Sequence, residues 1–343
     1  MTRYWPHLLG GLVTYGLFIM LPPSDVAVYQ NYAQAFLLHG GWPREYPPLA
    51  IVPMLLPRLL PVPYVVGWGF FTLVLWTTLL ILLDRPLLWV GLAPFATVVL
   101  GTYDVWPILA MILAYLLIER RPTLSWALLG AAVALKLFPL LLVPLWWQQQ
   151  RRGWWAFFLP LITFYPPLMW SVLHYQTARQ AEWESTVSIL SWLFGSHSMQ
   201  VRQAFGSIEY FNGLSGTIGT ALEAVFLGVF AWAVVGMRQK SLPQRALVVL
   251  SAWFLSEKVL SAQYVLWVVA WAAVEEDGLW PWIQVLWLTA LEYPWLGTLL
   301  WLRDHVMFQP GSLSESIVAL RQAVWLIALG SGLVRPQKEG TSE

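Results

Sequence analysis

The stretch YVVGWGFFTLVLWTTLLILLD, residues 64–84, decides the class of fold. It is apolar almost throughout, and its only charged residue, Asp84, comes at the end. At a rise of about 1.5 Å per residue, a helix of about 20 apolar residues crosses the hydrocarbon core of a bilayer. The stretch therefore predicts a transmembrane helix.

The rest of the chain has the same character. Of its 343 residues, 58% are hydrophobic and 11% are charged, whereas a soluble domain is about 25% charged. Only helices and closed barrels satisfy their backbone hydrogen bonds in lipid. The other apolar runs are rich in Leu, Ala and Val and lack the alternation of a barrel strand. We expect an all-α, polytopic membrane protein with a single membrane domain over residues 1–343.

Charge and residue usage exclude several classes of function. A net charge of +1 gives no electrostatic case for nucleic-acid binding. The absence of cysteine excludes disulfides, zinc–thiolate sites and iron–sulfur clusters. His39, His174 and His197 have no HExxH or paired-carboxylate spacing around them. We therefore expect no metal site and no cofactor.

Basic turns set the orientation, because cytoplasmic loops carry an excess of Lys and Arg. The short basic turns are Arg85, Arg120 with Arg121, Arg151 with Arg152, residues 238–245 and residues 335–338. Placing all of them inside predicts about twelve spans in the plasma membrane, with both termini in the cytoplasm. The expected spans are 8–22, 64–84, 86–101, 104–119, two short helices within 124–147, 153–173, 216–238, 243–257, 260–275, 279–301 and 314–334.

Three segments depart from simple spans. Residues 23–46 and 174–215 are expected to form the first and the largest outer loop. The apolar piece 48–60 contains two prolines and is too short to cross, so we expect it to be re-entrant or interfacial. Trp residues at predicted span ends suit an interfacial aromatic belt; they are Trp5, Trp42, Trp106, Trp146, Trp147, Trp154 and Trp155.

Ionisable residues from separate regions of the chain fall on the outer side of this topology. Such groups in or beside a span cost several kcal/mol unless they are paired or hydrated, so they mark functional cavities. They are Asp25, Glu45, Asp104, Lys136, Arg179, Glu184, Glu257 and Lys258. Lys136 should lie at the outward turn between the two short helices of 124–147. We expect these side chains to converge on one cleft.

Short motifs around these residues resemble those of a known family. They are Ser24-Asp25 with Tyr29, Tyr32 and Glu45-Tyr46-Pro47-Pro48-Leu49; Tyr103-Asp104; Leu129-Gly130 through Lys136, Phe138 and Pro139; Arg179 with Glu184-Ser185; and Lys258 with Ser261, Gln263, Tyr264 and Trp267. In order and spacing the chain resembles the C-type glycosyltransferases, and within them glycosyltransferase family 87, the polyprenol-phosphate-mannose-dependent α-mannosyltransferase-like group. Ala262 and Thr102 depart from the expected pattern, where a proline and a polar amide are common.

The resemblance implies a C-type glycosyltransferase fold and an inverting transfer of a hexose. The donor would be a polyprenyl-phosphate sugar and the acceptor a lipid-linked or glycan hydroxyl among the membrane lipids. Mannose is the expected sugar, with arabinose and glucose left open. Asp25 would be the general base, and Lys136, Arg179 and Lys258 would bind the donor phosphate. The implied substrate-binding residues are Tyr29, Tyr32, Glu45, Tyr46, Asp104, Lys136, Arg179, Glu184, Lys258, Gln263 and Tyr264.

The same residues have structural alternatives. Asp25 and Asp104 suit helix starts, and Lys136 can extend to the lipid headgroups. Lys258 has an acidic neighbour, Glu257, and the remaining side chains can serve in packing or in solvated loops. A transporter or flippase is the alternative of another class, but it would place polar groups at the midplane of inverted repeats. Here they collect on one side and no repeat is visible.

Overall fold

The computed structural model describes residues 2–21, 24–162, 166–195, 199–205, 207–275, 278–296 and 313–334. The predicted basic tail, 335–338, and His197 lie outside the described residues. Helices make up most of the described chain, as predicted, and one short antiparallel hairpin joins them.

The helices and strands follow one another along the chain in two halves, with the hairpin in the second half. The first half contains α1 (Trp5–Met20), α2 (Ser24–His39), α3 (Ile51–Leu55), α4 (Tyr64–Leu83), α5 (Leu88–Leu92), α6 (Ala96–Gly101), α7 (Val105–Leu116), α8 (Pro122–Leu135) and α9 (Val143–Gln149). The second half contains α10 (Phe158–Leu161), α11 (Pro166–Ala178), α12 (Thr186–Phe194), β1 (Gln200–Ala204), β2 (Ser207–Phe211), α13 (Ser215–Ala231), α14 (Leu242–Ser256), α15 (Val265–Val274), α16 (Leu279–Ala290) and α18 (Leu313–Val334). Short 3₁₀ or π turns extend or connect them at Thr2–Tyr4, Pro48–Ala50, Leu56–Leu59, Ala93–Phe95, Phe138–Leu142, Trp154–Phe157, Trp232–Gly236, Ala262–Tyr264 and Leu291–Leu296.

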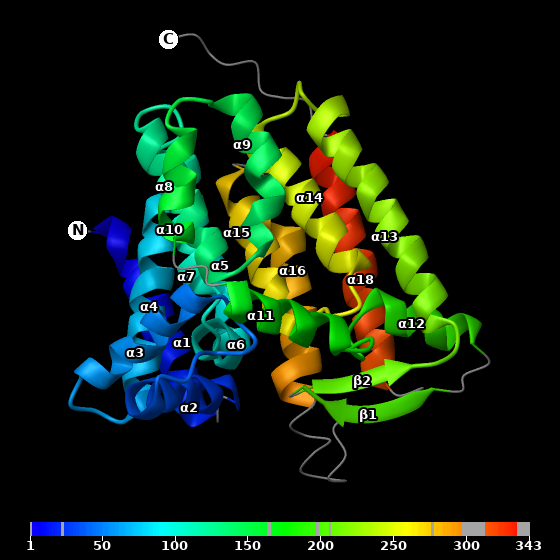
Figure 1. The fold of residues 1–343 in the computed structure, drawn as a ribbon, viewed down its shortest axis with the longest axis horizontal. Coiled ribbons are helices and arrows are strands. Elements are labelled where there is room, and N and C mark those ends of the chain that lie inside the picture. The colour runs from blue at the N-terminus through cyan, green and yellow to red at the C-terminus, as the bar shows by residue number, and fades with distance from the viewer. Residues whose placement is uncertain are drawn as a thin grey trace.

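The long helices stand side by side, and a set of shorter elements lies across one end of them (Figure 1). α2, α11, α12 and the β1–β2 hairpin form this transverse set at the lower end of the view. The turns between α7 and α8, α9 and α10, and α13 and α14 lie at the upper end. The predicted outer loops and these three basic turns are therefore at opposite ends of the bundle.

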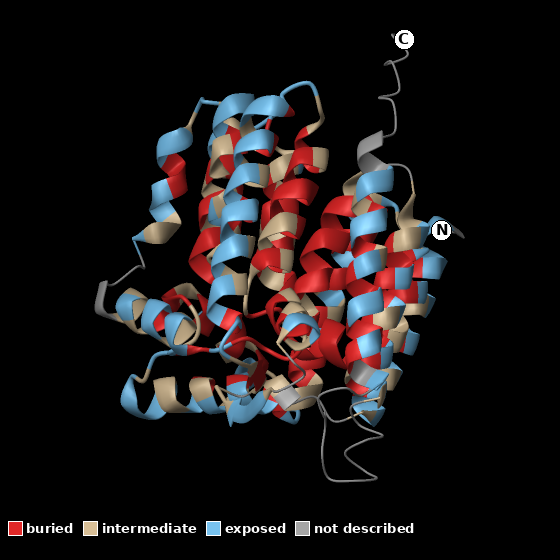
Figure 2. Cartoon of the chain, turned by 90° about the vertical axis from the view of Figure 1, so that its right-hand side faces the viewer, coloured by how far each residue is buried: buried red, intermediate tan, exposed pale blue. Residues whose placement is uncertain are grey.

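Residues coloured as buried lie mainly on the inner sides of the upright helices, and exposed residues lie mainly on their outer faces (Figure 2). The core contains large rings with almost no exposure, among them Trp68, Trp76, Trp267 and Trp271. Trp146, which the sequence pattern assigns to the interfacial belt, is fully buried in this core. It donates from its indole N–H to Ser125 Oγ (3.0 Å), so a specific core partner determines its position.

The predicted pair of short helices within 124–147 is confirmed. α8 ends at Leu135, and Lys136 takes an extended backbone conformation (φ −154°, ψ 137°) before the 3₁₀ turn that contains Pro139. Proline in this turn prevents α8 from continuing, since it has no backbone N–H to donate. Earlier in α8, Gly130 allows close packing, because a Cβ there would lie 2.1 Å from the Phe157 carbonyl oxygen. The break leaves Lys136 between two helices.

A second break places Asp104. The segments Leu88–Gly101 and Val105–Leu116 bend by 110° where they meet. Thr102 is extended there, and Asp104 directly precedes α7, at the N-cap position but with no capping hydrogen bond from its side chain. The acid is therefore carried into the middle of the bundle on a sharp turn.

Two helices are long and apolar enough to cross a membrane, Tyr64–Leu83 and Ser215–Gly236. Up to four candidates result if Trp5–Met20 with Asp25–His39, and Leu88–Gly101 with Val105–Leu116, each count as one bent span. These assignments rest on length and composition among the described residues, and the count of about twelve stays a prediction. The segment Pro48–Leu59 is a short broken helix, whereas the expected loop 174–215 contains α12 and the hairpin.

Candidate functional site

A cavity of about 810 Å³ lies where the transverse elements meet the bundle. Most of the predicted site residues line it. They are Asp25, Glu45, Tyr46, Lys136, Arg179, Glu184, Lys258, Gln263 and Tyr264. Glu257, which was predicted for the outer face, lines it too. Residues from distant parts of the chain are thus brought to one site, and Asp25 shares that site with Lys136.

Asp25 reaches the cavity from the first turn of α2 and is half-buried. An acidic residue in the first turn is favourable because the N-terminus of a helix carries partial positive charge. Asp25 can therefore stabilise the start of α2 and line the cavity at the same time.

Lys136 forms a buried ion pair in the cavity wall. Its Nζ lies 2.7 Å from Asp104 Oδ1, and the two residues are 8% and 1% exposed. Trp267 donates from its indole N–H to the same oxygen at 2.6 Å. The ammonium also lies 4.9–6.0 Å from the ring centroids of Tyr103, Phe138, Tyr264 and Trp267. A buried carboxylate and four rings hold the cation at the wall, so it is not extended towards the headgroups.

Arg179 is paired with a residue that the sequence pattern did not single out, Glu182. The two form a buried ion pair, and Arg179 also donates to Ser207 Oγ at 3.1 Å. Glu182 accepts from Ser261 Oγ (3.0 Å), and its backbone N–H donates to the Lys258 carbonyl (2.8 Å). Glu182 is 4% exposed and lines the cavity. The available signal was an opposite charge three residues after Arg179.

Glu45 lines the cavity and is held by a hydrogen bond from a tyrosine. Tyr32 donates its hydroxyl hydrogen to Glu45 Oε1 at 2.9 Å. Burial raises the pKa of Glu45, and the Tyr32 hydrogen bond and the nearby Arg179 charge oppose that rise. Tyr32 therefore reaches the site through Glu45.

Tyr29 and Asp104 are not among the residues that line the cavity. Tyr29 is 1% exposed, and its ring centroid lies 4.6 Å from that of Trp68 and 6.0–6.1 Å from those of Tyr46 and Tyr103. It supports the wall from behind Tyr46. Asp104 likewise acts on the cavity through Lys136.

Lys258 and Glu257 line the side of the cavity nearest α13 and α14. The Lys258 ammonium donates to the Thr177 carbonyl at 3.1 Å, which joins this loop to the end of α11. Glu223, on α13, also lines the cavity. Burial, with a smaller contribution from the Glu223 charge, raises the pKa of Glu257 to about 7, and Lys258 opposes the rise.

This pKa predicts a pH dependence of stability. The folded protein holds the Glu257 proton more tightly than the unfolded chain, whose pKa is near 4.5. The stabilisation is complete below about pH 4.5 and is lost as the pH rises through about 7. The melting temperature in detergent should fall by about 2–4 °C between about pH 5 and pH 8. Glu257→Gln should flatten that dependence, and Glu119→Gln, at the opposite end, should not.

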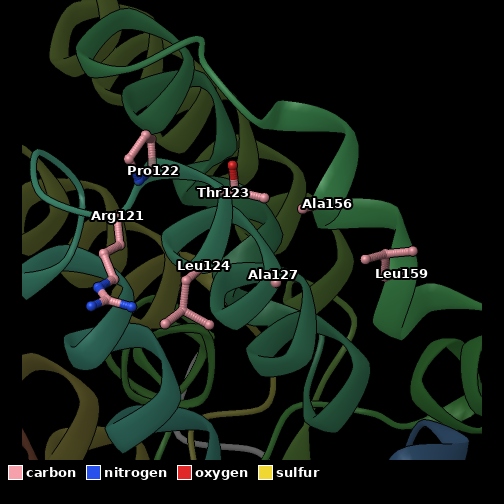
Figure 3. Close-up of a pocket in the computed structure, with 7 residues that line it drawn as sticks. All are labelled: Arg121, Pro122, Thr123, Leu124, Ala127, Ala156 and Leu159. Atoms are coloured by element: carbon pink, nitrogen blue, oxygen red, sulfur yellow. The ribbon is translucent and has the colours of Figure 1, made fainter.

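No group of three metal-binding side chains occurs among the described residues. A second hollow, of about 440 Å³, lies between the start of α8 and the segment 156–159 (Figure 3). Apart from Arg121 and Thr123 its lining is apolar, and it contains none of the predicted site residues. The larger cavity is therefore the candidate active site.

Comparison with known protein families identifies a relationship for most of the chain. The family model for glycosyltransferase family 87 matches residues 45–260. The comparisons with curated proteins and with solved structures gave no match. The matched segment carries Glu45, Lys136, Arg179 and Lys258 of the cavity wall. Because it covers more than half of the 343 residues, the chain belongs to glycosyltransferase family 87.

Proposed function

We propose that the protein is an inverting hexosyltransferase of the membrane that uses a polyprenyl-phosphate sugar as donor. Its acceptor is a lipid-linked or glycan hydroxyl at the outer face, and both termini are cytoplasmic. The observation that carries the proposal is the shared cavity of Asp25, Lys136 and Arg179. It brings the Asp25 carboxylate together with fixed cations, which is what this transfer requires.

The reaction assigns a task to each group. The acceptor oxygen attacks the anomeric carbon while the bond from that carbon to the phosphate oxygen breaks. Asp25 takes the acceptor proton. The donor phosphate leaves as a monoester and gains negative charge, which Lys136, Arg179 and Lys258 stabilise. Since each cation is already fixed by a protein oxygen, little reorganisation is needed as the charge develops.

The apolar part of the cavity suits a lipid donor. Residues 137, 138, 140 and 141 line this part of the cavity, and so do Val172 and Leu173 of α11. Leu140 and Leu173 are 49% and 47% exposed, so they mark an apolar mouth.

The polar wall suits a sugar. Gln263 and Tyr264 supply hydrogen-bonding groups to the cavity that Lys136 lines, and Glu45 and Tyr46 line it as well. We propose mannose as the transferred hexose, on the basis of the family resemblance. Glucose and arabinose donors are the competing substrates to include in any assay.

The test is transfer of labelled mannose from polyprenyl-phosphate-mannose by the purified protein in detergent. Polyprenyl-phosphate-glucose, polyprenyl-phosphate-arabinose and a nucleotide-activated mannose serve as alternative donors. We expect label to pass from the polyprenyl-phosphate-mannose into lipid-linked or glycan material. Transfer from the nucleotide sugar alone would contradict the proposed donor class.

Glu182→Gln is expected to lower transfer about tenfold, mainly through a higher KM for the donor. The change removes the counter-charge that fixes Arg179 but keeps a side chain of similar size. Ser261→Ala is the matched control, because it removes the Ser261 hydroxyl contacts to the two Glu182 oxygens (3.0 and 3.3 Å) and leaves the Glu182 charge in place. A Glu182→Gln protein with the donor KM of Ser261→Ala would contradict this role.

A further inference from the structure

A second buried charge cluster lies behind the cavity wall and joins the last described helix to the site. Arg321 Nη1 lies 2.8 Å from Glu292 Oε2 and 3.3 Å from Glu184 Oε2. Arg321 and Glu292 have no exposed surface, and the Glu184 side chain is 12% exposed. The three residues come from α18, from the turn after α16 and from the loop before α12.

The cluster also holds the main chain. Arg321 Nη2 donates to the Glu184 carbonyl at 3.0 Å, and Gln322 Nε2 donates to the same oxygen at 3.1 Å. Two neighbouring side chains of α18 therefore fix one peptide group. That group is two residues from Glu182, which carries the contacts to Arg179 and Ser261.

The charge balance argues for a specific role. One guanidinium faces two carboxylates, so the cluster retains a proton or excess negative charge in a buried place. Burial and the nearby Glu292 charge raise the pKa of Glu184. Buried ion clusters add little net stability compared with apolar packing, because their desolvation is costly. The geometry that the cluster imposes is the more direct explanation for it.

We propose that Arg321 is a positioning residue: it anchors the segment 179–185 from α18 so that Arg179 and Glu182 are correctly placed in the cavity. Arg321 is not among the cavity-lining residues, so it does not touch the substrate. It also lies beyond the family match, which ends at residue 260. The kinetic part of the proposal rests on the proposed function, whereas the anchoring part does not.

Arg321→Met alone leaves two buried carboxylates without a cation, and this variant is expected to fold poorly. Arg321→Met with Glu292→Gln keeps the net charge of the cluster while removing the guanidinium donors. Arg321→Lys keeps the charge but not the forked contact. Arg245→Gln is the matched control, because Arg245 is buried and bonds backbone carbonyls near the opposite end of the bundle.

The first measurement is hydrogen exchange in detergent. In the double variant, amides of the segment 179–186 should exchange at least about tenfold faster, and those of α7 and α14 should not change. This segment includes the backbone amides of Glu182 and Trp183, which in the wild type donate to the carbonyls of Lys258 and Ile208. In Arg245→Gln the segment should keep its wild-type protection. Unchanged exchange in the double variant would overturn the proposal.

The second measurement is kcat for transfer, scaled to the folded fraction. The double variant should lose about 10- to 100-fold in kcat, because displacements of about 1 Å at a site have effects of this size. Arg321→Lys should recover part of that loss, and Arg245→Gln should match the wild type. Wild-type kcat in the double variant would overturn the positioning role. If the wild type transfers no sugar, but amide exchange in 179–186 still becomes faster in the double variant, the proposed function fails and the anchoring role stands.

Discussion

Asp25→Asn is expected to lower kcat for hexosyl transfer about 1,000-fold while the protein remains folded. Asparagine keeps the size of the side chain and its suitability for a helix start, so α2 should be retained. It cannot accept the acceptor proton, so the attacking oxygen stays a poor nucleophile. The measurement is initial rate against donor and acceptor concentration, with melting temperature as the check on folding.

The kinetic pattern separates a base from a binding residue. Loss of the base should appear in kcat, with little change in the KM of the donor. Asp84→Asn is the matched control. Asp84 does not line the cavity, and it pairs with Arg3 on the surface of the protein. Transfer by Asp25→Asn at the rate of Asp84→Asn would defeat the assignment of Asp25.

The sequence predicts well where the constraint is local. Pro139 ends α8 near Lys136 because proline has no backbone N–H to donate. The basic turns mark one end of the bundle because charged loop residues are costly to bury. Both effects act within a few residues of the chain. The convergence of Asp25, Glu45 and Lys136 followed from assigning sides to loops, and all three line one cavity. Of the eight ionisable residues expected at one cleft, seven line this cavity, and Asp104 lies behind its wall.

The residues that were missed depend on contacts between distant segments. Glu182 is important through Ser261 and Lys258, and Arg321 through Glu184 and Glu292, and no periodicity marks such pairs. The interfacial assignment of Trp146 was wrong for the same reason. Its partner, Ser125, lies on another helix, and the span-end pattern carries no information about it.

The predicted loop 174–215 shows a further limit. Its residues are too polar for a span, so the sequence pattern favours an irregular loop. In the structure α12 and the β1–β2 hairpin form there, and Tyr210 donates its backbone N–H to the Ala181 carbonyl at 2.8 Å. The hairpin thus packs against the segment that carries Arg179 and Glu182. Tertiary pairing, which hydropathy does not report, orders this side of the site.

The second large effect is expected for Lys136→Met. Asp104 is 1% exposed, and the change would leave its carboxylate without the cation 2.7 Å away. Breaking a buried pair in this way costs about 3–5 kcal/mol of stability. The Oδ2 atom of Asp104 has no hydrogen-bond partner among the described residues, and the donor left on Oδ1, the Trp267 indole N–H, carries no charge. The variant should melt at a much lower temperature and transfer no detectable sugar.

The double variant Lys136→Met with Asp104→Asn separates stability from function. An asparagine keeps an acceptor for the Trp267 indole N–H, now 2.6 Å from Asp104 Oδ1, and removes the buried charge. Most of the lost stability should return in the double variant. The effects of the two changes on the free energy of unfolding should therefore be coupled by about 2–3 kcal/mol. Transfer should stay at least about 100-fold below wild type, because the cation for the leaving phosphate is still missing. Lys240→Met, in the turn before α14 at the opposite end, is the control for loss of a lysine. A double variant that regains wild-type transfer together with its stability would show that Lys136 only balances Asp104, and the phosphate would then have to be bound by Arg179 and Lys258 alone.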